Sequence, residues 1–286
     1  MPSGRSRGMT AATLQLIPFA IFATMFLLLP TSYLFIGAFQ DQSGHFTFGN
    51  IAKLFTPSVL NAYTLSIEIS LASSVLGALL GTAVAWSIKE GALPNWVRQG
   101  VTTLSGVTSN FAGVPLAFAF LATLGRTGLV TALLSYLGFD LYRQGFSIYN
   151  VFGLTLTYLY FQLPLMVLVV LPAIDGLKKE WNEASAMLGA TPTQHFFGVT
   201  LPILAPSVLG AALLLFANSF GAVATAFALT SGSINLITIL LFAQIRGDVL
   251  HDANLGYALA FGMVVITGLC NLGYLWLRSV SERRSA

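Results

Sequence analysis

The stretch DGLKKEWNEASAMLGATPTQHFFGVTLPILAP, residues 175–206, is a polar interruption between two strongly apolar segments. It gathers the charged residues that the flanking segments lack. Four apolar side chains recur along its first half at the spacing of one helical face: Leu177, Trp181, Ala184 and Leu188. The first half therefore predicts a short helix with one apolar stripe.

A break follows this helix at Gly189, because glycine readily adopts the left-handed conformation that commonly ends a helix. Thr191 is predicted as the N-cap of a second short helix, with Pro192 at its first position. Gln194 lies three residues after Thr191, so the pair predicts a capping box. This second helix leads to Pro202, where the next apolar segment begins.

The same stretch resembles the cytoplasmic loop of permease subunits of bacterial ABC importers. The family pattern is E-A-A, three residues, G, nine residues and I-x-L-P. Here it reads Glu183–Ser185, then Gly189, then Val199–Pro202, with the spacing kept throughout. The sequence departs from the pattern at Ser185, which replaces the second Ala, and at Val199, which replaces Ile.

In that family the loop is a coupling helix that docks into a groove on a cytoplasmic ATPase subunit. The resemblance implies that Glu183 caps or forms a salt bridge at this groove and that Gly189 allows the sharp turn. An ordinary helix–turn–helix between two membrane spans is the alternative. The residues implied in ATPase coupling are Trp181, Glu183, Ala184, Ser185, Leu188, Gly189, Leu201 and Pro202.

The composition is that of an integral membrane protein. Only 8% of the 286 residues are charged, against about 25% in a soluble domain. The mean hydropathy is +0.80, and the chain has room for about six spans of about 20 apolar residues. The net charge of +3 reflects cations at the flanks of apolar runs and does not indicate nucleic-acid binding. We predict an all-α, polytopic protein with a single transmembrane permease domain over residues 1–286.

Six apolar runs are predicted to span the membrane: residues 12–38, 61–88, 101–124, 151–174, 201–229 and 255–276. The segment 125–150 is too broken for a span and predicts a short interfacial helix, with Tyr136 and Tyr142 as anchors. The segment 230–254 holds a short apolar part, about 234–245, which predicts a re-entrant or interfacial helix.

Small and polar residues mark three of these spans. Gly77 and Gly81 form a small-xxx-small pair that lets another helix approach closely. The segment 102–113 is rich in Ser, Thr, Asn and Gly, so the third span is predicted to pack against protein or line a water-filled path. Pro18 and Pro30 predict a bend in the first span.

The distribution of Lys and Arg predicts the orientation in the membrane. With the N-terminus in the cytoplasm, nine of the thirteen cations are cytoplasmic, including Lys89, Arg98, Lys178 and Lys179. The reverse orientation leaves only four of the thirteen there. Both termini and the coupling loop, about residues 175–200, are therefore predicted to be cytoplasmic.

The sequence lacks the signature of an ATP-hydrolysing subunit. No Lys follows a Gly, so the phosphate-binding loop G-x-x-x-x-G-K-[ST] is absent. His45, His195 and His251 are scattered, which predicts no metal site, and no spacing supports a nucleophile–base pair. We predict that the chain is not an enzyme, has no catalytic residues and binds no cofactor, and that a separate ATPase subunit binds ATP and Mg.

Glu68 is an ionisable residue inside the second span, about 10 Å from its outer end at 1.5 Å per residue. A carboxylate at that depth costs a few kcal/mol unless it is paired or faces water. Two interpretations stay open. Glu68 either lies at a helix interface, protonated or bonded to Ser and Thr neighbours, or faces the translocation path and attracts a cationic substrate.

A second candidate patch for the substrate path lies in the fifth span and comprises Phe216, Asn218, Ser219 and Phe220. In the ABC importer fold the fifth span lines the central path, so the resemblance implies a pathway role for this patch. Aromatic rings there are able to stack on a cation. Simple helix packing is the alternative.

The resemblance covers most of the chain, from about Asn61 to Trp276. The run LPLMVLVVLPAIDGLKKEWNEASAMLGA, residues 163–190, resembles the spermidine/putrescine-type branch of type I importers. That branch implies a polyamine or similar organic cation as the solute, and related branches handle aminoethylphosphonate, iron or sulfate. It also implies a bacterial inner-membrane complex with a second, different permease subunit, two ATPase subunits and an extracytoplasmic substrate-binding protein.

Two other functional classes stay open from the residues themselves. A secondary transporter or channel working alone would need inverted repeats or coupling-ion sites at mid-membrane, and the sequence shows neither. A structural membrane partner, such as an assembly scaffold, would have no need of a coupling motif.

Overall fold

A computed structural model describes residues 16–91, 93–246 and 252–285 of the chain. Apart from one isolated bridge between Gln40 and Phe46, these residues form helices, turns and loops. Within the described residues, six helices are long and apolar enough to cross a membrane. These observations confirm the predicted all-α, polytopic fold class.

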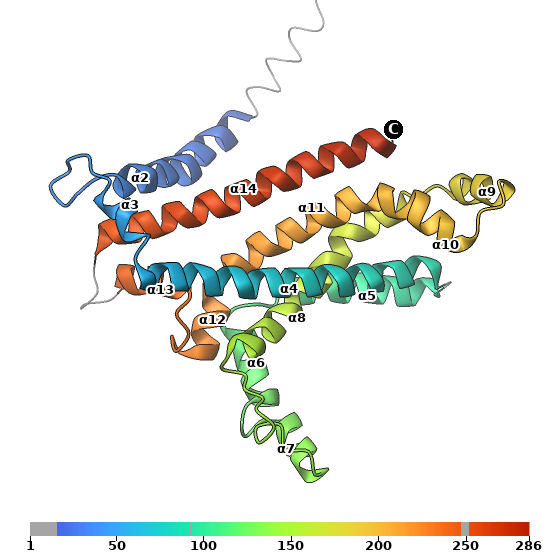
Figure 1. Ribbon diagram of the computed structural model, residues 1–286, viewed down its shortest axis with the longest axis horizontal. Helices are drawn as coiled ribbons and strands as arrows, with labels where there is room; N and C mark the ends of the chain where they lie inside the picture. Colours follow the sequence, from blue (N-terminus) through green and yellow to red (C-terminus); the bar gives the residue numbers. More distant parts are fainter. Residues whose placement is uncertain (1–15, 92, 247–251, 286) are drawn as a thin grey trace, which may run out of the picture. The chain divides into compact units, whose positions relative to one another are not determined.

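The helices (Figure 1) are η1 (Thr24–Leu28), α2 (Leu29–Ala38), α3 (Gly49–Lys53), α4 (Pro57–Glu90), α5 (Asn95–Asn110), α6 (Val114–Leu124), α7 (Leu129–Tyr136), α8 (Val151–Asp175), α9 (Lys179–Met187), α10 (Pro192–His195), η2 (Phe196–Thr200), α11 (Leu201–Phe220), α12 (Val223–Thr230), α13 (Ile237–Arg246) and α14 (Ala253–Ser285). The two η elements are single π-helical turns.

The chain divides into two compact units. The small unit comprises Met1–Leu60 and Leu241–Val264, and the large unit comprises Asn61–Leu240 and Val265–Ala286. Helices α4, α13 and α14 each pass from one unit into the other. The prediction of a single domain over 1–286 concerns the arrangement of these two units and stays a prediction.

The large unit has two apolar cores, one of them where α4, α8 and α11 pack together. The predicted pair of small residues on α4 faces α8 at this contact. A Cβ atom added at Gly81 would lie 2.5 Å from the Cβ of Met166, and one added at Gly77 would lie 2.9 Å from that of Gln162. Both positions therefore need glycine for α8 to approach α4 this closely.

A buried amide joins the three helices of this core. Gln162 on α8 is fully buried, and its Nε2 donates hydrogen bonds to Ser73 Oγ of α4 at 3.3 Å and to the Leu215 carbonyl of α11 at 3.1 Å. Donor groups inside an apolar core are costly unless they find such partners. The amide therefore favours one relative placement of α4, α8 and α11.

Two predicted spans are each broken in two. The predicted span 101–124 divides into α5 and α6, because Gly113 has a φ of +76° and the chain turns there. Helix α5 has 16 residues and is too short to count among the six membrane-crossing candidates, and the candidate in this region is Val114–Tyr136. The predicted span 201–229 divides into α11 and α12 at Gly221.

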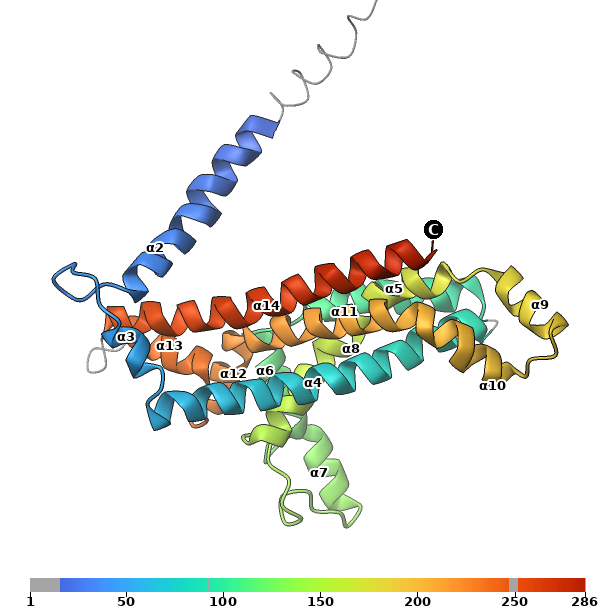
Figure 2. The same cartoon turned by 45° about the horizontal axis from the view of Figure 1, so that its top comes forward.

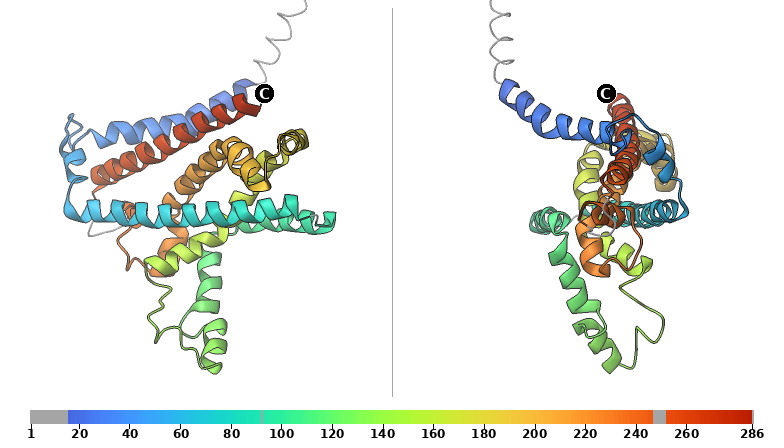
Figure 3. Two further views of the ribbon diagram at one scale, coloured as in Figure 1. Left: turned by 45° about the vertical axis from the view of Figure 1, so that its right-hand side comes forward. Right: turned by 90° about the vertical axis from the view of Figure 1, so that its left-hand side faces the viewer.

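Helices α6 and α7 run away from α8 (Figure 3), and α7 is the short helix predicted in segment 125–150. Its Tyr136 is 89% exposed. Tyr142 instead turns back, because its hydroxyl donates a hydrogen bond to the Leu124 carbonyl at 2.9 Å and its ring lies under the Arg126 guanidinium. The anchoring role predicted for the two tyrosines at a membrane interface stays a prediction.

In the small unit, the first candidate span is Leu16–Ala38 and none of its most apolar window is buried within the chain. The irregularity expected at Pro30 takes the form of the π turn η1, where the Leu29 N–H reaches the Thr24 carbonyl. A π turn of this kind relieves the clash that a proline ring makes inside an α-helix. The part of 230–254 that is described holds α13, a ten-residue helix that is too short to span.

Asp252 ties the start of α14 to α3 within the small unit. Its carboxylate accepts a hydrogen bond from Lys53 Nζ at 2.7 Å and from the Leu255 N–H at 3.1 Å. Partial burial acts to raise the pKa of this carboxyl, but the hydrogen bonds from Lys53 and from backbone N–H groups outweigh it and hold the pKa below its ordinary value. The last helix begins at this cap and is longer than the predicted 255–276 span.

Candidate functional site

The segment that the sequence singled out lies at one end of the large unit, where α9 and α10 project beyond α8 and α11 (Figure 1). Gly189 ends α9 with a φ of +78°. Its N–H donates to the Ala186 carbonyl, and the Ala190 N–H donates to the Ser185 carbonyl, both at 3.0 Å. This pair of bonds satisfies the last carbonyls of α9, so the predicted left-handed helix end is confirmed.

The capping box predicted for the second helix is also present. Thr191 Oγ1 accepts a hydrogen bond from the Gln194 N–H at 3.3 Å, and Gln194 Oε1 accepts one from the Thr191 N–H at 2.8 Å. Beyond His195 the chain passes through the π turn η2 directly into α11 (Figure 2). The region from Pro192 to Phe220 is therefore helical throughout, and it bends between α10 and α11, where η2 lies (Figure 1).

The predicted apolar stripe does not form one buried face. Helix α9 begins at Lys179 and ends at Met187, so Leu177 and Leu188 lie outside it. Trp181 is half-buried against the large unit, whereas Ala184 is exposed and Leu188 is 88% exposed. The stripe fails because it spans two helix ends, where the chain direction changes and helical spacing no longer aligns side chains.

The exposed side of the loop offers apolar surface to a partner. Met187 and Leu188 are 87% and 88% exposed, and Glu183 lies on the same short helix with its carboxylate exposed. At the start of α11, Leu201 and Pro202 are exposed as well. The ATPase-coupling roles of these residues stay predictions, but their exposure leaves them accessible for contact.

Ser185, one of the two departures from the family pattern, connects α9 and α10. Its Oγ lies 2.8 Å from His195 Nδ1 and donates its own hydrogen to the Asn182 carbonyl at 2.9 Å. A hydroxyl has a single hydrogen to donate, so the contact with His195 needs the proton on Nδ1. Sequence reasoning missed this pair because the two residues lie on different helices, ten positions apart.

Cationic side chains from α4 and α5 contact the end of α8, where the coupling loop begins. Lys89 Nζ donates to the carbonyls of Ile174 and Leu177, the latter at 3.3 Å, and so caps the end of α8. Arg98 of α5 forms a salt bridge with Asp175, the last residue of α8. From the sequence, these cations predict only the orientation of the chain in the membrane. In the structure, their contacts hold the position at which the coupling loop continues from α8.

A second candidate site lies where the two broken spans meet. The Gly113 N–H donates a hydrogen bond to Thr225 Oγ1 at 2.7 Å, which joins the start of α6 to the start of α12. A cavity of about 570 Å³ opens beside this junction. Its lining comes from both breaks and consists of Ser109, Asn110, Ala112, Gly113, Phe161, Ala217, Asn218, Gly221, Ala222, Val223, Ala224 and Thr225.

Of the patch predicted on the fifth span, only Asn218 lines this cavity. Phe216 and Phe220 are buried and stack on each other with ring centroids 5.7 Å apart. Ser219 is buried and donates to carbonyls of its own helix, Leu215 and Phe216 among them. Phe216, Ser219 and Phe220 are thus buried by packing within this chain, and the pathway role stays a prediction for all four residues.

Glu68 lies on the exposed side of α4, together with apolar neighbours such as Ile67 and Leu71. Ser66 and Ser70 face the other way and are buried. Within the part of the chain that the structure describes, no hydrogen bond or ion pair is found for the Glu68 carboxylate. The interpretation in which serine neighbours satisfy it inside the chain is therefore not what the structure shows.

Comparison with known proteins places this geometry in a family. Residues 77–286 match the family described as "Binding-protein-dependent transport system inner membrane component". The chain belongs to this family. It is a multi-pass inner-membrane permease of a binding-protein-dependent ABC importer, and such permeases are not themselves ATPases.

Curated relatives of the permease include the molybdenum transport system permease protein ModB of Mycobacterium bovis, 29% identical over 225 residues, which cover 78% of this chain and 81% of that one. The sulfate transport system permease protein CysT of Salmonella typhimurium is 28% identical over 214 residues, or 73% of this chain and 71% of that one. These relatives do not support the polyamine branch that was predicted from the 163–190 run.

Solved structures share the fold of the permease. A bacterial ABC transporter involved in the import of the acidic polysaccharide alginate superposes with a TM-score of 0.70 at 19% identity, covering 97% of this chain and 96% of that one. The MetNI methionine ABC transporter gives a TM-score of 0.53 at 15% identity, covering 79% and 99%. At these identities the likeness concerns the fold.

Proposed function

We propose that this permease forms the membrane pathway for a small oxyanion, such as molybdate or sulfate, in an ATP-driven importer. The observation that carries the proposal is the similarity, over about three quarters of the chain, to permeases named for molybdenum and for sulfate transport. Sulfate is among the solutes that the family resemblance left open. Stand-alone transport and scaffolding are not what membership in this family indicates.

The chemistry of the cavity at the helix breaks supports an anionic solute. Its lining has hydroxyl and amide groups from Ser109, Asn110, Asn218 and Thr225 but no acidic side chain. Helices α6 and α12 begin at this cavity and helices α5 and α11 end there, so their partial positive and partial negative charges offset one another. The absence of a carboxylate from the lining is the feature that favours an anion over a cation.

A polyamine gains less support from the same surfaces. A polycation needs carboxylates or aromatic faces along its path, and two of the aromatic rings predicted to serve it, Phe216 and Phe220, are buried in helix packing. Glu68 is the membrane-embedded acid that remains, and it would repel an oxyanion. We therefore propose that Glu68 lies off the translocation path, against a protein partner that pairs with it.

The partners follow from the family and are part of the proposal. An extracytoplasmic binding protein delivers the solute, a second permease subunit completes the pathway, and two ATPase subunits bind ATP and Mg. The loop from α9 to α10 faces the cytoplasm, as the excess of Lys and Arg on that side favours. Met187 and Leu188 then meet the ATPase groove, and Glu183 forms its polar contact there.

In this mechanism, closure of the ATPase subunits on ATP drags the coupling helices with the groove. The motion enters the large unit at two points: at the end of α8, which Lys89 and Arg98 contact, and along the bent helical segment that begins at α10 and continues into α11. The second of these ends beside the cavity at the helix breaks, at Phe220. Rigid-body movement of these helices alternates access to that cavity.

Purification of the tagged chain with its partners, in gentle detergent from its native membrane, is the experiment that tests this proposal. Mass spectrometry identifies the co-purified proteins, and proteoliposomes of the complex are then assayed with radiolabelled molybdate, sulfate and putrescine. We expect an ATPase, a six-span partner and ATP-dependent uptake of an oxyanion. Uptake of putrescine alone would overturn the proposal that the solute is an oxyanion. Recovery of the chain without an ATPase would overturn the proposal that it assembles into an importer.

A further inference from the structure

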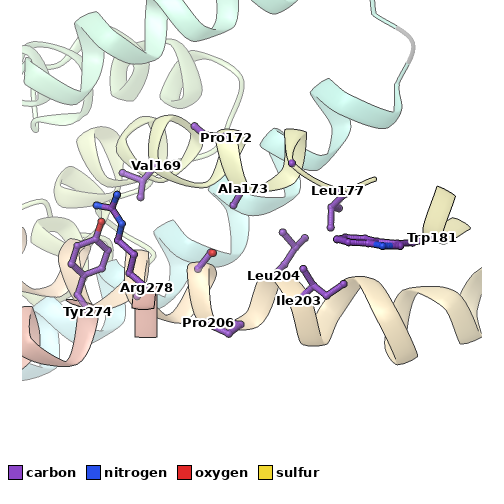
Figure 4. Close-up of a pocket in the computed structure, with 13 residues that line it drawn as sticks. Val169, Pro172, Ala173, Leu177, Trp181, Ile203, Leu204, Pro206, Tyr274 and Arg278 are labelled. Carbon is purple, nitrogen blue, oxygen red and sulfur yellow. The ribbon is translucent and has the colours of Figure 1, made fainter. Parts of the chain in front are cut away.

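Two further cavities of the large unit differ in what surrounds them. The larger, of about 470 Å³, lies beside Trp181 of α9 (Figure 4), and exposed residues such as Pro172 and Arg278 form part of its lining. The smaller has a volume of about 10 Å³, and every residue that lines it is buried. The small cavity therefore lies within the packed interior of the large unit, and the proposed transport cycle gives it no role.

The small cavity is lined mainly by hydroxyl groups, although it lies beside an apolar core. Five of its eight lining residues carry a hydroxyl: Ser66 and Ser70 of α4, Tyr158 of α8, Ser219 of α11 and Thr238 of α13. A buried hydroxyl costs free energy unless it has a hydrogen-bond partner. The gathering of five hydroxyls around one space therefore indicates that the space accommodates a polar molecule.

The volume of the small cavity restricts this molecule to a single water. A buried site needs about 10–15 Å³ and two to four polar partners to hold one water. The cavity, at about 10 Å³, reaches the lower end of this range, and its hydroxyl groups supply the partners. Organic ligands occupy pockets of about 300–1,000 Å³ and are far too large for it.

The hydrogen bonds around the small cavity provide both a donor and an acceptor for a water. Ser66 Oγ accepts a hydrogen bond from the Ile237 N–H at 2.9 Å, so its own hydrogen is available to donate. The Tyr158 hydroxyl donates to the Ala222 carbonyl at 2.6 Å, so its oxygen is available to accept. A water has two hydrogens and two lone pairs and therefore bonds to both groups at once.

We propose that the small cavity binds one ordered water, which joins α4, α8, α11 and the start of α13. The water accepts a hydrogen bond from Ser66 and donates one to Tyr158. The hydroxyls of Ser219 and Thr238 complete its set of partners. This site lies apart from the cavity at the helix breaks and does not depend on which solute the permease carries.

The proposed water connects the break between α11 and α12 to two further helices. Tyr158 bonds to the water and to the carbonyl of Ala222, which lies at this break and lines the cavity there. Where helices break inside a membrane protein, hydroxyl side chains and ordered waters satisfy the freed backbone groups. The water therefore links that cavity wall to α4 and to the start of α13, neither of which contributes to its lining.

Direct observation of the water tests the proposal. The purified complex in nanodiscs is imaged by cryo-electron microscopy at a resolution that shows ordered waters. We expect one density peak within about 2.5–3.0 Å of the hydroxyl oxygens of Ser66 and Tyr158, the usual distance for a hydrogen bond between two oxygens. A map that shows other buried waters but no peak in this cavity would overturn the proposal.

The direction of a stability change gives an independent test. Thr238→Val keeps the shape of the side chain and replaces its hydroxyl with a methyl group. Loss of one partner of the bound water should lower the thermal midpoint of the complex by about 2–4 °C, the shift that one lost hydrogen bond produces in a domain of about 200 residues. In a dry cavity the same substitution would remove a costly buried hydroxyl, so an unchanged or raised midpoint would overturn the proposal.

Thr157→Val is the matched control. Thr157 is fully buried in α8, does not line the small cavity and donates to the Gly153 carbonyl of its own helix at 2.9 Å. A bond of this kind adds little to helix stability, so the control should shift the midpoint less than Thr238→Val. Equal shifts in the two variants would show that the cavity contributes nothing to the effect and would overturn the proposal.

The choice of salt distinguishes a water from a metal cation, which oxygen ligands also bind. The midpoints of the wild-type and Thr238→Val complexes are measured in sodium, potassium and choline chloride. A bound water predicts the same difference between the two complexes in all three salts. A difference that appears only with sodium or potassium would show that the oxygens bind that cation, and it would overturn the assignment of a water.

Discussion

The coupling loop and the helix-break junction both interrupt helices, and they satisfy the broken backbone in opposite ways. Between α9 and α10, Gly189, Thr191 and Gln194 form the capping bonds within a few positions of one another. At the junction, the Gly113 N–H depends on Thr225, which lies 112 positions away. The loop can therefore move as a preformed piece, whereas the junction exists only while α6 and α12 stay together.

Replacing the junction glycine should have the largest effect of the substitutions considered. Gly113 has φ +76° and ψ −149°, a combination that is essentially restricted to glycine and costs other residues about 1–3 kcal/mol. We expect Gly113→Ala to lower the thermal midpoint of the purified complex and to reduce uptake together with stability. Fluorescence-detected size-exclusion after heating measures the midpoint.

Gly106→Ala is the matched control, since a Cβ atom added at Gly106 in α5 meets no atom within 4 Å. This variant should be as stable as the wild type or slightly more stable, because alanine favours the helix. If the two variants shift the midpoint equally, the junction does not depend on its backbone conformation and the contrast between the two regions is lost.

A substitution in the loop should change the amount of solute transported per ATP hydrolysed and should leave the thermal midpoint nearly unchanged. Gly189→Val places a β-branched residue at φ +78°, a left-handed conformation that costs about 1–2 kcal/mol. We expect transport per ATP hydrolysed to fall about tenfold, as an energy of that size implies, while the thermal midpoint stays close to wild type. Uptake and ATPase activity are measured in the same proteoliposomes.

Gly189→Asn keeps the geometry, because asparagine tolerates the left-handed region, and it should retain most of the coupling. Unchanged transport in the Gly189→Val protein would count against a coupling role for the turn. A parallel loss of stability and transport would instead make the loop resemble the junction.

A charge at the junction cavity tests which region meets the solute. Asn218 is exposed in that open cavity, so a carboxylate there repels an anion by about 1 kcal/mol at 4 Å in water-like surroundings. We expect Asn218→Asp to lower oxyanion uptake about fivefold, and Asn218→Ala to change it less. An increase in uptake with Asp would indicate a cationic solute.

The smallest effect is expected for the hydroxyl that bridges the loop. Ser185→Ala removes the contact with His195 Nδ1 and should lower coupling by the equivalent of about 0.5–1.5 kcal/mol, the typical net value of one hydrogen bond. A double-mutant cycle with His195→Ala measures the interaction. Additive effects of the two substitutions would show that the bridge carries no coupling energy.

The same contrast explains what the sequence could predict. The break at Gly189 and the capping box at Thr191 were predicted correctly, because the residues that form them are neighbours in the chain. The break at Gly113 was missed, and the run 101–124 was taken as one span. This break is stabilised by the hydrogen bond that the Gly113 N–H donates to Thr225 Oγ1. No pattern among neighbouring residues in the sequence predicts that contact.

The site residues also divide into those that a local pattern predicts and those that depend on contacts between distant parts of the chain. Asn218 was identified by its polarity inside an apolar run, but its partners Ser109 and Asn110 were assigned only to a polar helix start. Phe216 and Phe220 share that run with Asn218, and their inward direction depends on how α11 packs against α4 and α8. Lys89 and Arg98 were placed at a membrane edge, while their contacts with the end of α8 needed the fold.

Helix α11 sets a length scale for the proposed cycle. It has 20 residues, so at 1.5 Å per residue its length is about 30 Å. A tilt of about 10° about one end of a helix of this length moves the other end by about 5 Å, close to one helical turn. A small rotation imposed where η2 meets α11 would therefore be amplified into a displacement of that size beside Phe220.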